Sequence, residues 1–127
     1  MNLLWIGLGS ALGGIGRFAL QGAAARLFGA TFPWGTLGVN VIGSAFIGFF
    51  AGLTAPEGRW FVSSTTRQFV MIGVCGGFTT FSSFSLETLN LANDGETLLA
   101  GANVAASVVI CLLAVWAGHA LAAALNR

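Results

Sequence analysis

The residues from Gly73 to Glu87 include most of the side chains in this sequence that could do chemistry. They read GVCGGFTTFSSFSLE, so two adjacent glycines are followed by two threonines and then by two phenylalanines and a carboxylate. Glycine and threonine are poor helix formers, and Ser or Thr can bond the backbone groups that a helix break releases. We therefore expect a helix broken near Gly76 to Thr80, with a glycine-weakened helix packed against a neighbour as the alternative. Unwound carbonyls at such a break are suitable ligands for a small cation such as Na⁺.

The residues after the expected break sort into two stripes on a helix. Phe81 and Phe84 form an aromatic ridge, while Thr80, Ser83 and Glu87 form a stripe of hydroxyls and a carboxylate. The positive edge of an aromatic ring attracts a small anion without a fixed charge, and conduction requires binding weak enough to permit exit. The two stripes predict the lining of an anion pathway, with core packing as the alternative for the phenylalanines.

Two further polar residues lie inside apolar segments. Asn40 carries an amide that must find a partner when buried: its NH₂ group could donate to an anion, or it could bond a neighbouring helix. Arg17 is costly in lipid and by default marks a functional site. It could raise the anion potential of a water-filled vestibule or pair with Glu87. His119, alone near the C-terminal end, is interpreted as structural.

Membrane-spanning helices must position these residues. Only 7% of the 127 residues are charged and 56% are hydrophobic, whereas a soluble domain carries about 25% charged residues. A span needs about 20 apolar residues. The sequence therefore predicts an all-α membrane protein, in which the third helix is broken at its centre and the first is retained rather than cleaved. The expected single four-helix domain covers residues 1–127, with spans at about 3–28, 34–53, 68–91 and 98–125.

Charge and cysteine usage exclude other classes of function. A net charge of +1 offers no basic stripe for nucleic acid. The sequence shows no nucleophile with a base, no paired carboxylates and no metal-ligand cluster, so it does not indicate an enzyme. Cys75 and Cys111 lie in apolar stretches and are interpreted as small buried hydrophobes.

The arginines predict insertion in both orientations. With the N-terminus inside, the inner side collects Arg59, Arg67 and Arg127, and the outer side collects Arg26 with Arg17. Lys/Arg asymmetry fixes topology, so this small bias permits both orientations. We expect the chain to pair antiparallel with itself.

Glycines four residues apart predict close helix contacts. Gly9 with Gly13, and Gly48 with Gly52, form small-xxx-small pairs, which allow helix backbones to approach closely in a membrane. Packing within one subunit is the preferred interpretation of each pair, and a dimer seam is the alternative.

Taken together, the motifs closely resemble those of the Fluc/CrcB fluoride channels. The resemblance covers essentially the whole chain and is carried by GGIGR at 13–17, PWGT at 33–36, Val39, Asn40 and Gly43, and GGFTTFSSFS at 76–85. It implies a passive channel that exports fluoride down its gradient and so lowers cytoplasmic fluoride. It further implies a multi-pass protein of the plasma (inner) membrane that contacts membrane lipid and inserts in both orientations. Two copies would form an antiparallel homodimer with two pores.

The resemblance also implies roles for individual residues. A structural Na⁺ at the dimer centre would be held by backbone carbonyls of Gly76 and Thr79 from each subunit. The implied pathway consists of the vestibule arginine Arg17, the pore amide Asn40, the pore phenylalanines Phe81 and Phe84, and the polar track Ser82, Ser83 and Glu87 next to Thr80. Some members place a Tyr on the fourth span. This chain has none, and Asn103 or Ser107 occupies that neighbourhood.

Two other functions fit four short spans. A small proton-coupled multidrug exporter needs a membrane-embedded carboxylate on its first span, where this chain has Arg17. A subunit that only assembles with others would need no helix break. The fluoride channel is therefore the leading hypothesis.

Overall fold

Four long apolar helices make up most of the computed structural model, which describes residues 2–127. Helix α1 spans Asn2–Phe28, α2 spans Trp34–Leu53 and α6 spans Thr97–Leu125, while the third long helix runs through Ser64–Asn93 with an interruption. Each is long and apolar enough to cross a membrane. The predicted all-α fold with four long apolar helices is thus confirmed.

The third helix consists of four consecutive pieces. These are α3 (Ser64–Arg67), the π-helical segment η1 (Gln68–Cys75), α4 (Gly76–Phe78) and α5 (Phe81–Asn93). It begins earlier than the predicted residue 68 because the Ser63 side chain accepts a hydrogen bond from the Thr66 N–H and so caps α3.

The break in the third helix is narrower than the sequence predicted. Only Thr79 and Thr80 are extended, with ψ of 159° and 122°. Gly76 and Gly77 lie within α4. Gly77 is needed for close packing, because a Cβ on it would collide with the backbone of Ser10 in α1. The glycines therefore permit a close approach, and the two threonines form the break itself.

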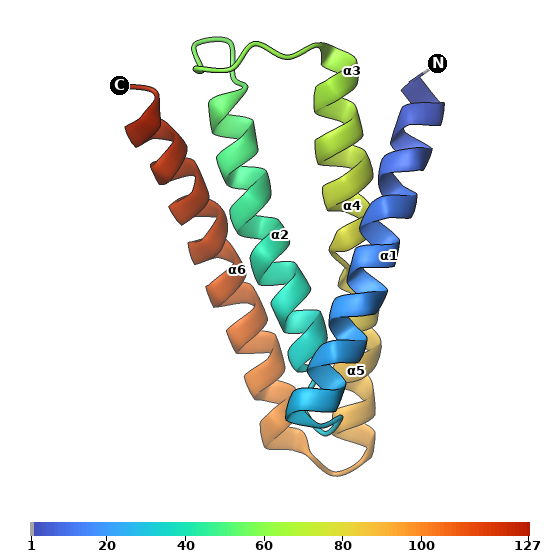
Figure 1. Ribbon diagram of the computed structural model, residues 1–127. Coiled ribbons are helices and arrows are strands. Elements are labelled where there is room, and N and C mark those ends of the chain that lie inside the picture. The colour runs from blue at the N-terminus through green and yellow to red at the C-terminus, as the bar shows by residue number, and fades with distance from the viewer. Residues whose placement is uncertain (1) are drawn as a thin grey trace.

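Helix α1 runs beside the first half of the third helix and α2 runs beside α6 (Figure 1), and glycines allow close contact in both pairs. Gly9 and Gly13 bring α1 against the backbone of η1 and α4, and Gly48 and Gly52 bring α2 against α6. A Cβ at Gly9, Gly13 or Gly48 would collide with backbone atoms of the facing helix, and one at Gly52 would collide with the Ala122 side chain. Both predicted small-xxx-small pairs thus pack within one chain, which confirms the preferred interpretation.

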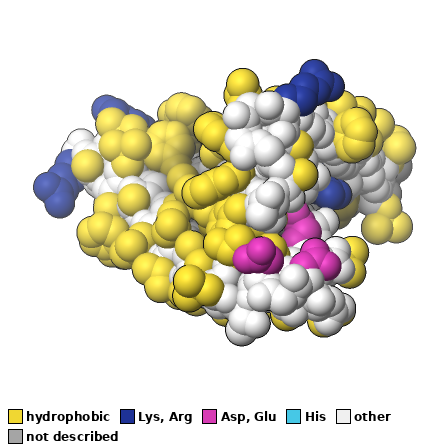
Figure 2. Space-filling model, turned by 90° about the horizontal axis from the view of Figure 1, so that it is seen from below, with side chains coloured by type: hydrophobic (Ala, Val, Ile, Leu, Met, Phe, Trp, Pro, Cys, Tyr) yellow, Lys and Arg dark blue, Asp and Glu magenta, His cyan; other side chains and the backbone are white. Residues whose placement is uncertain are grey.

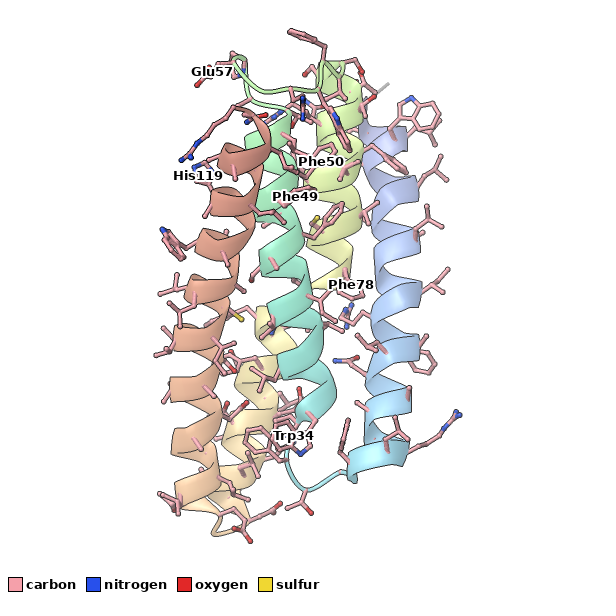
Figure 3. All side chains as sticks on the ribbon, turned by 60° about the vertical axis from the view of Figure 1, so that its left-hand side comes forward. Trp34, Phe49, Phe50, Glu57, Phe78 and His119 are labelled. Carbon is pink, nitrogen blue, oxygen red and sulfur yellow. The ribbon has the colours of Figure 1, made fainter. Side chains whose placement is uncertain are left out.

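The bundle has two distinct ends. The start of α1, the end of α6 and the 54–63 connector share the terminal end, where the Asn126 side chain bonds the Arg59 N–H and the Gly52 carbonyl. The connections 29–33 and 94–96 lie at the opposite end, which we call the connection end. Figure 3 shows Trp34 at the connection end and His119 near the terminal end. Large apolar side chains cover the outside, as lipid requires.

Candidate functional site at the helix break

The amide of Asn40 clamps the break in the third helix. Asn40 is in α2, and its Nδ2 donates to the Thr80 carbonyl at 3.0 Å while its Oδ1 accepts from the Thr80 N–H at 2.8 Å. Both backbone groups of one extended residue are satisfied by a single side chain. Of the two interpretations of Asn40, the interhelical hydrogen bond is the one the structure contains. One amide proton of Nδ2 is left for another acceptor.

Thr80 also starts α5. Its side chain accepts a hydrogen bond from the Ser83 N–H at 3.1 Å, which makes it the N-cap of that helix. Its hydroxyl lies 3.3 Å from that of exposed Ser82. Thr80, Ser82 and Ser83 therefore form one cluster of hydroxyls and backbone donors at the break.

The break releases backbone carbonyls from their helical partners. In an uninterrupted helix the Thr80 N–H would bond the Gly76 carbonyl and the Ser83 N–H would bond the Thr79 carbonyl, but these donors bind Asn40 and Thr80 instead. Gly76 and Thr79 also line a surface hollow of about 160 Å³, together with Gly43, Ser44, Ile47, Met71 and Cys75. The two carbonyls assigned to Na⁺ by the resemblance are thus among those that the break sets free.

Arg17 reaches the same region from α1. Its Nε donates to the Gly77 carbonyl at 3.0 Å, so the half-buried guanidinium lies at the C-terminal end of α4. Cations are favoured at that end of a helix. Glu87 accepts instead from Thr36. In the part of the chain that the structure describes, Arg17 and Glu87 are therefore not paired.

The two phenylalanines after the break differ in exposure. Their ring centroids are 5.3 Å apart with planes inclined by 52°, so the predicted pair does form one aromatic unit. Phe84 is 8% exposed and Phe81 is 77% exposed. The Phe84 ring is therefore buried within the chain, while the Phe81 ring lies on the surface of this single chain.

A polar chain crosses three helices next to Glu87. Gln21 of α1 donates to the Thr36 hydroxyl at 3.0 Å, and that hydroxyl donates to Glu87 Oε1 at 2.5 Å. Ser83 and Glu87 line the hollow there, which has a volume of about 360 Å³ and opens toward the connection end. Figure 2, which views this end, shows acidic side chains gathered there. Of the predicted stripe of Thr80, Ser83 and Glu87, the last two residues thus line a recess and Thr80 does not.

A second polar chain joins α5 to α6 and was not predicted as a connected unit. Asn103, 1% exposed, donates to the Thr88 hydroxyl at 2.9 Å, and that hydroxyl donates to the Phe84 carbonyl at 2.7 Å. Ser107 donates to Asn103 Oδ1 at 3.4 Å. The sequence signal for Asn103 and Ser107 was two polar residues four apart in an otherwise apolar span. Thr88 offered no signal, since its partner is distant in sequence.

The chain matches one protein family over most of its length. The model of the family described as "CrcB-like protein, Camphor Resistance (CrcB)" matches residues 4–119.

Similar proteins carry one name. A protein of Opitutus terrae named "Fluoride-specific ion channel FluC" is 65% identical over 97% of this chain and 93% of its own length. A Methylocella silvestris protein of the same name is 60% identical over 100% of this chain and 97% of its own. A third protein of that name, from Paramagnetospirillum magneticum, is 58% identical over 96% of this chain and 95% of its own length. Because the family match and these identities extend over nearly the whole chain, the protein belongs to the CrcB-like family.

Proposed function

We propose that this protein is a passive fluoride channel. The observation that carries the proposal is the clamped helix break, which gathers Asn40, Thr80 and Ser83 next to the exposed ring of Phe81. Three relatives of 58–65% identity are named fluoride-specific ion channels, which supports the same function.

The chemistry of the site suits a small, strongly hydrated anion. Fluoride is a hard acceptor, so donors must replace the water that it loses on entering a membrane. The free proton of the Asn40 amide and the hydroxyls of Ser82 and Ser83 are donors of this kind. The edges of Phe81 and Phe84 add weak attraction without a fixed charge, and Arg17 raises the anion potential at the entrance. Weak, successive contacts allow the ion to leave as well as to enter.

The conducting unit in this proposal is an antiparallel homodimer in the plasma membrane, with each subunit in the opposite orientation. Phe81 is 77% exposed on a single chain. A second copy packed against this ring would complete the wall of the proposed pathway. The arginines are nearly balanced between the two sides of the membrane, which supports insertion both ways. Two such surfaces related by a twofold axis give two pores, which would export fluoride down its gradient.

A structural Na⁺ at the dimer centre fits the residues present. The carbonyls of Gly76 and Thr79 have lost their helical donors, and the two residues line one hollow. Hard cations prefer oxygen ligands. One chain supplies too few oxygens, so the partner's equivalent pair would complete the shell. When bound, Na⁺ would neutralise the carbonyl dipoles and join the two helix breaks.

Fluoride efflux from liposomes tests the proposed function. Purified protein is reconstituted in liposomes loaded with fluoride and chloride, with a potassium ionophore to dissipate the membrane potential, and each anion is followed by an ion-selective electrode. We expect rapid fluoride release, retained chloride and no requirement for a proton gradient. Absence of fluoride release from correctly folded protein would overturn the channel hypothesis. Release that occurs only when a proton gradient is imposed would indicate a coupled exporter.

A further inference from the structure

Helix α5 carries the proposed pore residues but is mechanically separated from the rest of the third helix. Extended backbone at Thr79 and Thr80 precedes it, so α4 does not transmit its position through helical hydrogen bonds. The clamp at Asn40 holds only the first residue before α5. Beyond that point, contacts from neighbouring helices must set its register.

Two side-chain hydrogen bonds tie α5 to neighbouring helices: Glu87 accepts from Thr36 of α2, and Thr88 accepts from Asn103 of α6. The Asn103 amide is 1% exposed and donates to Thr88, while its oxygen accepts from Ser107 on the same helix. The Thr88 hydroxyl in turn donates to the Phe84 carbonyl, one turn earlier in α5. Phe84 in turn packs against Phe81. A continuous series of contacts therefore runs from the first part of α6 through three hydrogen bonds to Phe84, whose ring contacts Phe81.

We propose that Asn103 is a positioning residue for the fluoride pathway: through Thr88 it holds α5 against α6 at the register that places Phe84 and Phe81. This inference rests on the proposed function. An unpaired amide or hydroxyl in this apolar surrounding is costly, so slippage of α5 along α6 would break the Asn103 contact without supplying another partner. We call the Asn103–Thr88 bond the tether. It is the bond that fixes α5 relative to α6, because it joins two helices, whereas the Thr88–Phe84 bond lies within α5.

Substitutions of Thr88 and Asn103 separate positioning from stability. Asn103→Leu removes the tether and leaves the Thr88–Phe84 bond. Thr88→Val removes both bonds at nearly the same shape, and Thr88→Ser keeps both. We expect fluoride efflux per folded channel to fall about tenfold in Asn103→Leu and Thr88→Val, the factor that one interhelical hydrogen bond in a membrane supports. Thr88→Ser should retain the wild-type rate. The double variant Asn103→Leu/Thr88→Val should conduct no more slowly than Asn103→Leu, because both substitutions remove the same interhelical bond.

Thr54→Val is the matched control. The buried Thr54 hydroxyl donates to the Phe50 carbonyl at 2.7 Å, one turn earlier in its helix, as Thr88 does to Phe84. It lies at the end of α2, away from the break. We expect Thr54→Val to lower the unfolding temperature and to leave efflux per folded channel unchanged.

The outcomes distinguish the failure of this inference from that of the proposed function. If Asn103→Leu and Thr88→Val lower the unfolding temperature but conduct at the wild-type rate per folded channel, Asn103 is only structural and the inference is overturned. If Asn103→Leu does not assemble, the difference between Thr88→Val and Thr88→Ser decides the question. If the wild-type protein releases no fluoride, the proposed function fails, and the positioning role fails with it.

Discussion

At the scale of single residues, one side chain does several tasks at the helix break. The Asn40 amide satisfies the two backbone groups of Thr80 and keeps one proton free. The Thr80 side chain then caps the next helix. The break is thus stabilised by groups that also face the proposed pathway, so stability and conduction depend on the same residues.

We expect Asn40→Leu to reduce both stability and fluoride flux. It leaves the Thr80 N–H without a partner, which costs about 1–3 kcal/mol for a buried group, and it removes both the second bond to the Thr80 carbonyl and the free amide proton. Thermal unfolding and electrode-monitored efflux measure the two effects. Asn93→Ala, at an exposed amide near the end of α5, should change neither. Wild-type flux in Asn40→Leu would contradict the pore role of the amide.

The two pore phenylalanines should separate in their effect on stability. Phe81→Ile and Phe84→Ile should both impair fluoride flux, because each removes an aromatic edge. Phe84→Ile should lower the unfolding temperature more than Phe81→Ile, because Phe84 is buried within one chain and Phe81 is 77% exposed on it. Phe61→Ile is the control, since Phe61 is 90% exposed in the connector. Full conduction in both pore variants would remove the aromatic role.

At the scale of elements, the glycines decide which helices meet. Gly13 of α1 faces the backbone of residues 74–78, whereas a Cβ on the adjacent Gly14 would have nothing within 4 Å. The two neighbours therefore have opposite importance, although the sequence presents them as a pair.

Gly13→Ala should lower the unfolding temperature in detergent, while Gly14→Ala should leave it unchanged or raise it. The added methyl group at Gly13 collides with the Val74 carbonyl and the Phe78 N–H, and helix backbone cannot move aside as a flexible side chain can. At Gly14, alanine only improves helix propensity, by about 1 kcal/mol. Tryptophan fluorescence during heating measures both variants. Equal effects at the two positions would contradict the observed packing of α1.

At the scale of the whole molecule, the low charge of the chain has two consequences. Apolar side chains cover the outside of the helices, and the few arginines leave little bias between the two orientations. The proposed antiparallel dimer requires both.

We expect reporters fused to the C-terminus to be active on both sides of the membrane. A phosphatase reporter works only outside the cytoplasm and a fluorescent protein reporter only inside it, so both should give signals. Adding two lysines to the 54–63 connector should make one orientation dominant, because added positive charge favours the cytoplasmic side. Fluoride flux should then fall unless an oppositely biased copy is co-expressed. A single orientation of the unmodified chain would rule out the antiparallel dimer.

Na⁺ removal should destabilise the assembled protein. The unfolding temperature and the dimer fraction, measured by light scattering, should decrease when Na⁺ is replaced by a large organic cation, because the carbonyls of Gly76 and Thr79 would then repel those of the partner. Addition of Na⁺ should restore both values. A dimer of unchanged stability in Na⁺-free solution would contradict the structural ion.

The sequence by itself determined the membrane class, the four helices and the interruption of the third. These follow from hydropathy and local propensity, which act on near neighbours along the chain. It also singled out Asn40, Phe81 and Phe84, because a polar residue or a regular aromatic spacing within an apolar span is visible without a fold. The contraction of the break to Thr79 and Thr80 was not visible, since Gly77 lies in α4 and its missing Cβ admits the backbone of Ser10 from a different helix.

Only the tertiary structure decided the partners of the polar groups. Arg17 bonds the Gly77 carbonyl, Glu87 bonds Thr36, and Asn103 bonds Thr88. Each of these bonds joins residues on separate helices, and hydrogen bonding depends on distances of about 3 Å, which spacing along one helix does not define. The physical reason is that an unpaired polar group is costly in an apolar interior, while the packing of the helices determines which partner is within reach.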